Sequence, residues 1–204
     1  GDSITVHQAM QGMVTRSAND AAVAMAEKLG GTEQRFAALM TLRAQELGMT
    51  STNFANASGL PDSRQLTTAR DIAILSRAVM RDYPQYYRLF STKNFDFRGQ
   101  AIRNHNGLLY RMDGVDGLKT GFTNASGFNL AVSAVRDNRR LIAVVMGGPT
   151  VATRDRVAES LLLTGFEVMN RRARGEQITV AQNFFEPPQL AEATTPSLQQ
   201  GDTD

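Results

Sequence analysis

Two apolar runs separated by four residues limit the possible folds of this chain more than any other feature. FNLAVSAV at 128–135 and RLIAVVMG at 140–147 are rich in β-branched residues, and the polar stretch RDNR connects them. Two such runs joined by a short polar turn predict a β-hairpin. The apolar face of a sheet has to be covered, so the rest of the chain has to supply a layer that packs on it.

Helical patterns fill the sequence before this hairpin and return after it. A capping box of Thr5 and Gln8 opens the first expected helix, and Gly30 with Gly31 ends the second. The expected helices cover residues 6–14, 20–29, 32–47, a segment that begins after Thr68, and roughly 152–174. The order of helices, sheet and a returning helix predicts an α+β domain, with a helical cluster packed beside an antiparallel sheet.

The remaining segments give weaker signals. Residues 49–66 are dense in Ser, Thr, Asn, Gly and Pro and predict a long ordered loop, while 92–99 and 117–121 have the pattern of short strands. From Gly175 onward the chain has no Lys or Arg and is rich in Pro, Gln and Thr. We expect a strand at the start of this part and interpret 175–204 as a linker or disordered tail that follows a domain at 1–174.

The composition excludes several classes of function. The formal net charge is only +2, and basic residues do not cluster with aromatic ones, so no nucleic-acid partner is expected. No apolar run is long enough to span a bilayer. The sequence has no cysteine, so it offers no thiolate nucleophile. Its two histidines, His7 and His105, are isolated, so a Ser-His-Asp triad or a metal site is not expected, and neither is another cofactor. Any catalysis has to use other bases.

Two short motifs carry the chemistry that remains. Ser17-Ala18-Asn19 lies in the break between the first two expected helices, where Ser or Asn could equally cap the second one. Lys119-Thr120-Gly121 places a cation among small residues and hydroxyls, as at an anion-binding site, although a strand that starts after a tight turn also explains it. Serine hydrolases that lack histidine use lysine as the proton carrier, with a Lys-Thr-Gly strand facing a serine or asparagine across a cleft.

With both motifs in this order, the chain resembles the D-alanyl-D-alanine carboxypeptidases of the peptidase S11 type. These are low-molecular-mass penicillin-binding proteins of the penicillin-recognising serine hydrolase superfamily. The resemblance runs through GDSITVHQAMQGMVTRSANDAAVAMAE, LGMTSTNF, SGLPDSRQLTTARDIAILSRA, DGLKTGFTNASGFNLAVSA, RRLIAVVMG and LLLTGFE. It implies a β-lactamase/transpeptidase-like fold and a periplasmic or other extracytoplasmic location in a bacterial cell envelope.

The nucleophile motif of that family, Ser-x-x-Lys, is absent from this sequence. The lysines are Lys28, Lys93 and Lys119, and the residues three positions before them are Met25, Phe90 and Asp116. In the family this motif lies N-terminal to Ser-x-Asn, so we interpret the chain as the C-terminal portion of the catalytic domain. The chain alone is then expected to be inactive. A natural inactive homologue is the alternative.

The resemblance implies catalytic roles for three residues. In a complete family member, the nucleophilic serine attacks the carbonyl between the last two D-alanines of a peptidoglycan stem peptide, and water hydrolyses the resulting acyl-enzyme. Ser17 would pass a proton between the active centre and the leaving amine. Asn19 would hold the substrate amide. Lys119 would orient Ser17 and attract the terminal carboxylate.

The resemblance also implies substrate contacts. Thr120 and Thr123 would offer hydroxyls, Gly121 would let the substrate backbone lie along the strand, and the N–H of Phe122 would be an oxyanion donor. Arg154 would gather the terminal carboxylate, with a solvated surface arginine as the alternative.

Other functions stay open at this point. The partners implied are stem peptides ending in D-Ala-D-Ala and inhibitory β-lactams, and membrane association through regions outside this chain is left open. A class A β-lactamase-like hydrolase is the nearest enzymatic alternative, but its Glu-x-x-Leu-Asn pattern is missing here. A non-catalytic module that binds stem peptides is a second alternative, and a purely structural role for the motifs is a third. Asp71, in the family's TARD segment, is expected to be structural.

Overall fold

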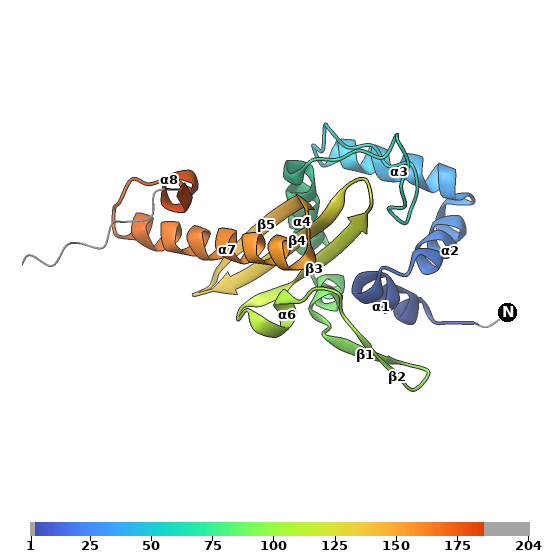
Figure 1. The fold of residues 1–204 in the computed structure, drawn as a ribbon. Coiled ribbons are helices and arrows are strands. Elements are labelled where there is room, and N and C mark those ends of the chain that lie inside the picture. The colour runs from blue at the N-terminus through green and yellow to red at the C-terminus, as the bar shows by residue number, and fades with distance from the viewer. Residues whose placement is uncertain (1–2, 186–204) are drawn as a thin grey trace, which may run out of the picture.

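A three-stranded antiparallel sheet forms the centre of the computed structural model, which describes residues 3–185 (Figure 1). Its strands are β3 (Val115–Thr123), β4 (Gly127–Arg136) and β5 (Arg139–Gly148), and a separate hairpin consists of β1 (Asn94–Phe97) and β2 (Gln100–Arg103). The helices are α1 (Val6–Arg16), α2 (Asn19–Gly30), α3 (Glu33–Glu46), α4 (Ala69–Asp82), α5 (Pro84–Tyr87), the 3₁₀ helix η1 (Arg88–Ser91), α6 (Leu108–Arg111), α7 (Val151–Ala173) and α8 (Val180–Phe185). The expected α+β class is confirmed.

The predicted hairpin is the pair β4 and β5. Its two-residue turn, Asp137 and Asn138, has positive φ angles of 49° and 56°, the conformation that matches the twist of a tight hairpin and that Asp and Asn tolerate. β3 pairs with the other side of β4, so within the described sheet β3 is an edge strand. The short strand expected at 117–121 is therefore confirmed, and it is longer than the sequence pattern indicated.

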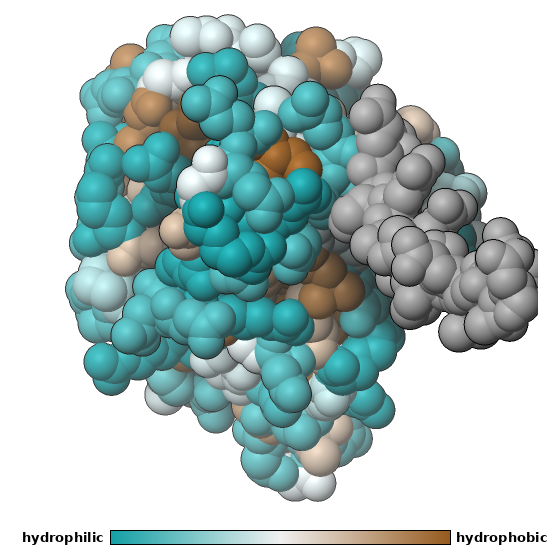
Figure 2. Space-filling view, turned by 90° about the vertical axis from the view of Figure 1, so that its left-hand side faces the viewer, coloured by the Kyte–Doolittle hydropathy of each residue, from teal (hydrophilic) through white to brown (hydrophobic). Residues whose placement is uncertain are grey.

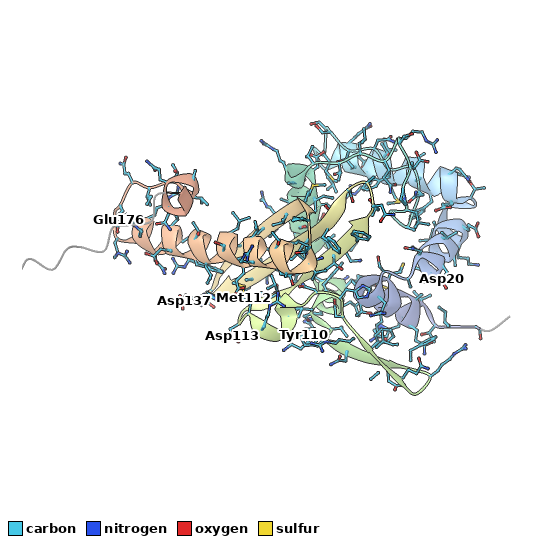
Figure 3. All side chains as sticks on the ribbon, in the orientation of Figure 1. Asp20, Tyr110, Met112, Asp113, Asp137 and Glu176 are labelled. Atoms are coloured by element: carbon cyan, nitrogen blue, oxygen red, sulfur yellow. The ribbon has the colours of Figure 1, made fainter. Side chains whose placement is uncertain are left out.

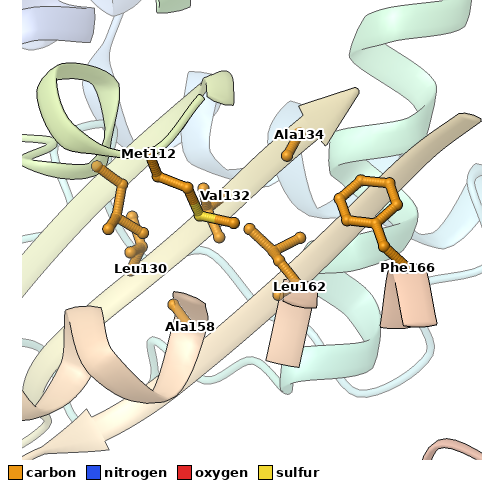
Figure 4. Packing of buried hydrophobic residues seen from close by; sticks show 9 residues of the cluster. Met112, Leu130, Val132, Ala134, Ala158, Leu162 and Phe166 are labelled. Carbon is orange, nitrogen blue, oxygen red and sulfur yellow. The ribbon is translucent and has the colours of Figure 1, made fainter. Parts of the chain in front are cut away.

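Helix α7 covers one face of this sheet (Figure 4). Its side chains pack against those of β4 in the main core. The buried members of this core are Leu108, Met112, Leu130, Val132, Ala134, Ala143, Ala158, Leu162 and Phe166. Burial of this many apolar side chains is the dominant favourable contribution to folding. The helix expected at roughly 152–174 is confirmed.

Helix α4 lies on the opposite face, with α5 and η1 beside it. The buried core there is smaller and consists of Tyr87, Leu118 and Ala131, with partly buried side chains such as Ile72 and Phe90 around it. The two faces of the sheet are therefore packed to different extents.

The helical cluster expected from the sequence is the arc of α1, α2 and α3 at the right of Figure 1. The capping box of Thr5 and Gln8 is present at α1. The turn between α2 and α3 requires Gly30, because a Cβ there would lie 2.8 Å from the Cβ of Phe36. The loop at 49–66 is ordered by a buried carboxylate: Asp71 accepts hydrogen bonds from the Ser51 N–H (2.9 Å) and the Thr52 hydroxyl (2.6 Å).

Three features differ from the sequence predictions. Residues 92–99 form only the first half of a hairpin, whose turn at Arg98 and Gly99 has positive φ angles of 54° and 76°. The short helices α5, η1 and α6 follow no long apolar period and were not predicted. The strand expected after Gly175 is wrong, because α8 forms there and Arg171 hydrogen-bonds both Glu176 and Asn183. The rest of the interpreted tail, 186–204, lies outside the described residues.

The surface is mixed in character. On the face shown in Figure 2, hydrophilic residues predominate and the hydrophobic ones form separated spots. Among residues 3–185, no helix is both long and apolar enough to cross a membrane.

Candidate active site

Two residues that lie 102 positions apart in the sequence meet at the end of α1. The Lys119 ammonium on β3 donates a hydrogen bond to the Ser17 hydroxyl, with an Nζ–Oγ distance of 3.0 Å. Ser17 ends α1 in the left-handed conformation, with φ 59° and ψ 44°. Residues other than glycine seldom adopt this conformation, and it is found preferentially at functional sites. The proximity of Ser17 and Lys119 that the resemblance implied is confirmed.

The structure argues against a capping role for the Ser-x-Asn motif. The N-cap of α2 is Ala18, and no side-chain hydrogen bond caps that helix. Asn19 is the first residue of α2 and is exposed. The Ser17 hydroxyl is bound by Lys119 rather than by the backbone of α2. Helix termination alone therefore does not account for either polar residue, and their roles in catalysis stay predictions.

Burial lowers the pKa of the Lys119 ammonium. The loss of water around the ammonium lowers the pKa of Lys119 to about 8, because an apolar environment disfavours the charged form. Its hydrogen-bond acceptors are the Ser17 hydroxyl and the Thr120 carbonyl (2.7 Å), and no carboxylate within residues 3–185 pairs with it. At neutral pH Lys119 is thus a cation without a counter-charge, and it releases its proton more readily than a surface lysine.

Lys119 lines a cavity of about 960 Å³ between α4, the loop that precedes it and the β3–β5 sheet. Apolar side chains form much of the wall, among them Leu66, Ile72, Leu75, Val79, Phe90, Leu118, Val144 and Met146. A second cavity of about 260 Å³ lies on the α1 side of Lys119 and is lined by Met10, Met13, Val14, Tyr86, Leu89 and Phe90. The ammonium therefore stands between two apolar hollows.

Gly121 borders the large cavity, and the protein's own packing does not require a glycine there. Its φ is not positive, and a Cβ at this position would meet no atom closer than the Asn129 Cβ at 4.0 Å. Glycine inside a strand costs roughly 0.5–1 kcal/mol relative to alanine. Neither the backbone conformation nor the packing explains this glycine. The missing side chain leaves open space along an edge strand, and another chain could approach the strand closely there.

The residues next to Gly121 differ in their surroundings. Thr120 and Thr123 both line the cavity, but the Thr123 hydroxyl already donates to the Ser126 hydroxyl (2.7 Å) and accepts from the Ser126 N–H (3.0 Å). The Phe122 side chain is 54% exposed and stacks on Phe128, with ring centroids 4.3 Å apart.

Arg154 lines neither of the two cavities at Lys119. It is only 3% exposed, so the alternative of a solvated arginine is wrong. Its guanidinium makes two hydrogen bonds to the carboxylate of Asp155 (2.9 and 2.7 Å) and one to the Asn129 carbonyl (3.4 Å). Asp155 also binds Arg111. In this arrangement Arg154 links α7 to β4 and is almost fully buried.

A polar cluster that was not predicted from the sequence supports β3. Asp116, three residues before Lys119, accepts hydrogen bonds from the Tyr87 hydroxyl (2.8 Å) and from both terminal nitrogens of Arg140 (2.9 and 2.7 Å). Desolvation and the Asp116 charge raise the pKa of Tyr87. The cluster ties α5 and β5 to the start of β3. Its only signal in the sequence was an acidic residue before the Gly-Leu-Lys-Thr-Gly stretch.

The described residues were compared with the geometry of a metal site. Within residues 3–185, no group of three His, Asp or Glu side chains is arranged to hold a metal ion. The Ser17 hydroxyl and the Lys119 ammonium can themselves supply proton transfer and attraction of an anion.

Comparison with known proteins gives one family throughout. A family model described as "D-alanyl-D-alanine carboxypeptidase" (Peptidase S11) matches residues 1–150. The chain is 38% identical to D-alanyl-D-alanine carboxypeptidase DacD of Escherichia coli (strain K12) and 40% identical to DacA of the same strain. Each match covers 91% of this chain but only 49% and 47% of the relatives, so the chain spans about half of their length.

Solved structures agree with the sequence relatives. Penicillin binding protein 5 from Haemophilus influenzae superposes with a TM-score of 0.79 at 40% identity, covering 82% of this chain and 49% of that one. Penicillin-Binding Protein D2 from Listeria monocytogenes, in its cefotaxime-bound form, gives 0.76 at 32% identity, covering 81% and 68%. The expected β-lactamase/transpeptidase-like fold is thus confirmed. With the family match over most of its length and the Ser17–Lys119 contact in place, the chain belongs to the D-alanyl-D-alanine carboxypeptidase family of S11 peptidases.

Proposed function

We propose that this chain forms one wall of the active site of a serine-type D-Ala-D-Ala carboxypeptidase, which removes the terminal D-alanine from peptidoglycan stem peptides. The contact between Ser17 and Lys119 carries the proposal, because it joins two distant motifs through the atoms that proton transfer needs. The names of the relatives support the same activity. Residues 1–174 are then part of the catalytic domain.

The nucleophile has to come from a segment that this sequence does not contain. The attacking serine belongs to a Ser-x-x-Lys motif, and none of the three lysines here has a serine three residues before it. The two apolar cavities on either side of Lys119 support a position for such a segment, since burying their walls is favourable. A helix seated there would bring its serine next to Ser17 and Lys119.

The proton path runs through Ser17 in this proposal. When the acyl-enzyme forms, the attacking serine bonds to the carbonyl carbon and gives its proton to the lysine of its own Ser-x-x-Lys motif. The C–N bond between the two D-alanines breaks, and the leaving amine needs a proton. The Ser17 hydroxyl gives up its proton to that amine and takes one from the ammonium of Lys119, whose lowered pKa makes the transfer easier. Asn19 would hold the substrate amide from the exposed start of α2.

The substrate backbone would lie along β3 as an added strand. β3 is an edge within the described sheet, and Gly121 leaves its surface open. The Phe122 N–H would donate to the oxyanion, and Thr120 and Thr123 would offer hydroxyls from the cavity wall. We do not assign the substrate carboxylate to Arg154, because its guanidinium is buried against Asp155.

The location and the inhibitors follow from the same family. Stem peptides lie outside the cytoplasm, so we propose an extracytoplasmic location in a bacterial cell envelope, with any membrane association through regions outside this chain. The cefotaxime-bound and ampicillin-bound Listeria structures support β-lactams as inhibitors of the intact enzyme.

A labelled penicillin tests the activity. The chain alone is expected to form no covalent adduct, whereas a version extended N-terminally to include a Ser-x-x-Lys segment is expected to form one. Ser17→Ala in the extended version should slow labelling while leaving the fold intact. An extended protein that folds and still refuses the label would exclude the enzymatic function.

The missing nucleophile also favours a second candidate, a non-catalytic module that binds stem peptides. This candidate predicts that N-acetyl-D-Ala-D-Ala binds the chain as it stands, measured by calorimetry, and that the gene encodes no Ser-x-x-Lys upstream. Finding that motif upstream would remove this candidate and leave the first.

A further inference from the structure

The side chain of Asn129 on β4 joins two neighbouring segments at one end of the sheet. Its amide nitrogen donates to the Ser126 hydroxyl (3.0 Å) and to the Gly127 carbonyl (3.0 Å), at the turn between β3 and β4. Its amide oxygen accepts from the Gly147 N–H (2.9 Å) on β5. The β3–β4 turn lies at the end of β4 opposite to Asp137, which Figure 3 labels. One amide therefore connects the end of β3 to β5 across β4.

The ladder between β4 and β5 is irregular at this point. The pairing shifts in register between Phe128 and Leu130, on either side of Asn129. Such a bulge leaves a residue outside the regular ladder, and bulges are frequent next to active sites, where they redirect a side chain. The Asn129 amide oxygen takes the Gly147 N–H, and Arg154 donates to the Asn129 carbonyl (3.4 Å). Side chains therefore supply bonds that fix the bulge.

Two hydroxyl groups carry this anchor to the end of β3. The Ser126 hydroxyl accepts from the Asn129 amide and from the Thr123 hydroxyl (2.7 Å). The Thr123 oxygen in turn accepts from the Ser126 N–H (3.0 Å). Thr123 lines the large cavity. The place of its hydroxyl on the cavity wall thus depends on Asn129 through a single intermediate, Ser126.

Asn129 itself lies beside the open part of β3. It is the cross-strand partner of Gly121, and it also lines the large cavity. Directly opposite residues of an antiparallel pair project from the same face, so the amide lies next to the space that Gly121 leaves open. Both amide donors are already used by Ser126 and Gly127. Asn129 therefore supports this part of the cavity wall and has no free donor for a ligand.

We propose that Asn129 is a positioning residue for the open strand β3. It holds the β3–β4 turn and the β5 bulge in one arrangement and so keeps Thr123 in place at the end of the strand. A site that binds another chain needs side chains fixed by surrounding hydrogen bonds, because a small displacement weakens the interactions. That the bound chain is a stem peptide rests on the proposed function, whereas the coupling of turn and bulge does not.

Hydrogen exchange measured by NMR tests the coupling in the 204-residue chain. Asn129→Ala should speed exchange of the Gly147 and Ser126 N–H groups by about tenfold, because the first loses its acceptor and the second lies in a turn that loses its anchor. Exchange of the Val132 N–H in the middle of β4 should not change. Asn170→Ala is the control, because the Asn170 amide oxygen accepts from Arg139 at the opposite end of β5.

A double-mutant cycle tests the positioning role in the extended version that carries a Ser-x-x-Lys segment. Asn129→Ala and Ser126→Ala should each slow penicillin labelling several-fold, and the double variant should be no slower than the slower single variant, since both remove the same connection. Asn129→Asp keeps the acceptor for Gly147 but loses the donors to the turn. It should slow labelling as Ser126→Ala does while exchange at Gly147 stays slow. Asn170→Ala should label at the wild-type rate.

Each outcome decides one proposal. Unchanged exchange at Ser126 and Gly147 in Asn129→Ala overturns the coupling, and so does faster exchange that includes Val132. Local loosening with labelling at the wild-type rate overturns the positioning role and makes Asn129 a purely structural residue.

If the extended wild type takes no label, the proposed function fails and binding of N-acetyl-D-Ala-D-Ala to the 204-residue chain decides the positioning role. An affinity that Asn129→Ala lowers several-fold supports it, and an unchanged affinity or no binding overturns it.

Discussion

The two faces of the β3–β5 sheet differ in how completely they are packed. On the α7 face, nine buried apolar side chains close the core. On the α4 face the buried cluster of the described residues consists of three side chains, and a cavity of about 960 Å³ remains beside them. The same strands supply both faces, so the difference lies in what covers them. The closed face holds the fold together, and the open face leaves Lys119 where another molecule or segment can reach it.

Truncating the same residue type on each face tests this contrast most strongly. Leu162 is 1% exposed in the closed core, whereas Leu75 is partly exposed on the cavity wall. We expect Leu162→Ala to lower the free energy of unfolding by about 2–5 kcal/mol and Leu75→Ala to cost less than about 1.5 kcal/mol, since it already faces empty space. Chemical denaturation of both variants gives the comparison. Equal losses would show that the α4 face is as well packed as the other.

Removing the carboxylate that fixes the cavity wall should have the next largest effect. Asp71→Ala leaves the Ser51 N–H and the Thr52 hydroxyl without their acceptor, which costs about 1–3 kcal/mol. Urea unfolding measures the loss, and faster proteolysis within 49–66 would localise it. Asp62→Ala is the matched control: its exposed ion pair with Arg64 lies in the same loop and should contribute much less. Similar losses for the two variants would contradict a structural role that is specific to Asp71.

Replacing the cation on the open face should separate binding from stability. Lys119→Met should weaken binding of N-acetyl-D-Ala-D-Ala at least tenfold, or about 1.4 kcal/mol. Its folded-state pKa of about 8 lies below the ordinary value of 10.5, so between these pH values the unfolded chain binds more protons. The stability of the wild type should therefore rise over this range by about 2–3 kcal/mol, and that of Lys119→Met should not. Calorimetric binding and pH-dependent denaturation test both parts. A variant that loses stability at neutral pH would make Lys119 a structural residue.

The pH dependence of ligand binding should give the smallest effect. Below pH 8 Lys119 is an ammonium and attracts a carboxylate, and above it this attraction is lost as the proton leaves. Affinity for the dipeptide acid should fall about tenfold between pH 7 and pH 9 if only the charged form binds. The dipeptide amide should bind with little dependence on pH, which makes it the control. An acid whose affinity stays constant over this range would exclude Lys119 as its cation.

Much of the fold was predictable because local patterns decided it. The hairpin of β4 and β5 followed from two β-branched runs around Asp137 and Asn138, and α7 followed from its apolar period. Where the local signal was short or absent, prediction failed: α5, η1 and α6 have only four residues each, and the segment after Gly175 became helical through contacts with Arg171. Such elements take their conformation from what they pack against.

By itself, the sequence determined the longer helices, the β4–β5 hairpin and the two motifs, because periodicity, caps and turn residues act over a few positions along the chain. Only the tertiary structure decided which polar groups meet. It placed Lys119 against Ser17 and turned Arg154 inward onto Asp155. The strength of charge interactions and the cost of desolvation depend on distances between residues far apart in the chain, and folding alone sets those distances.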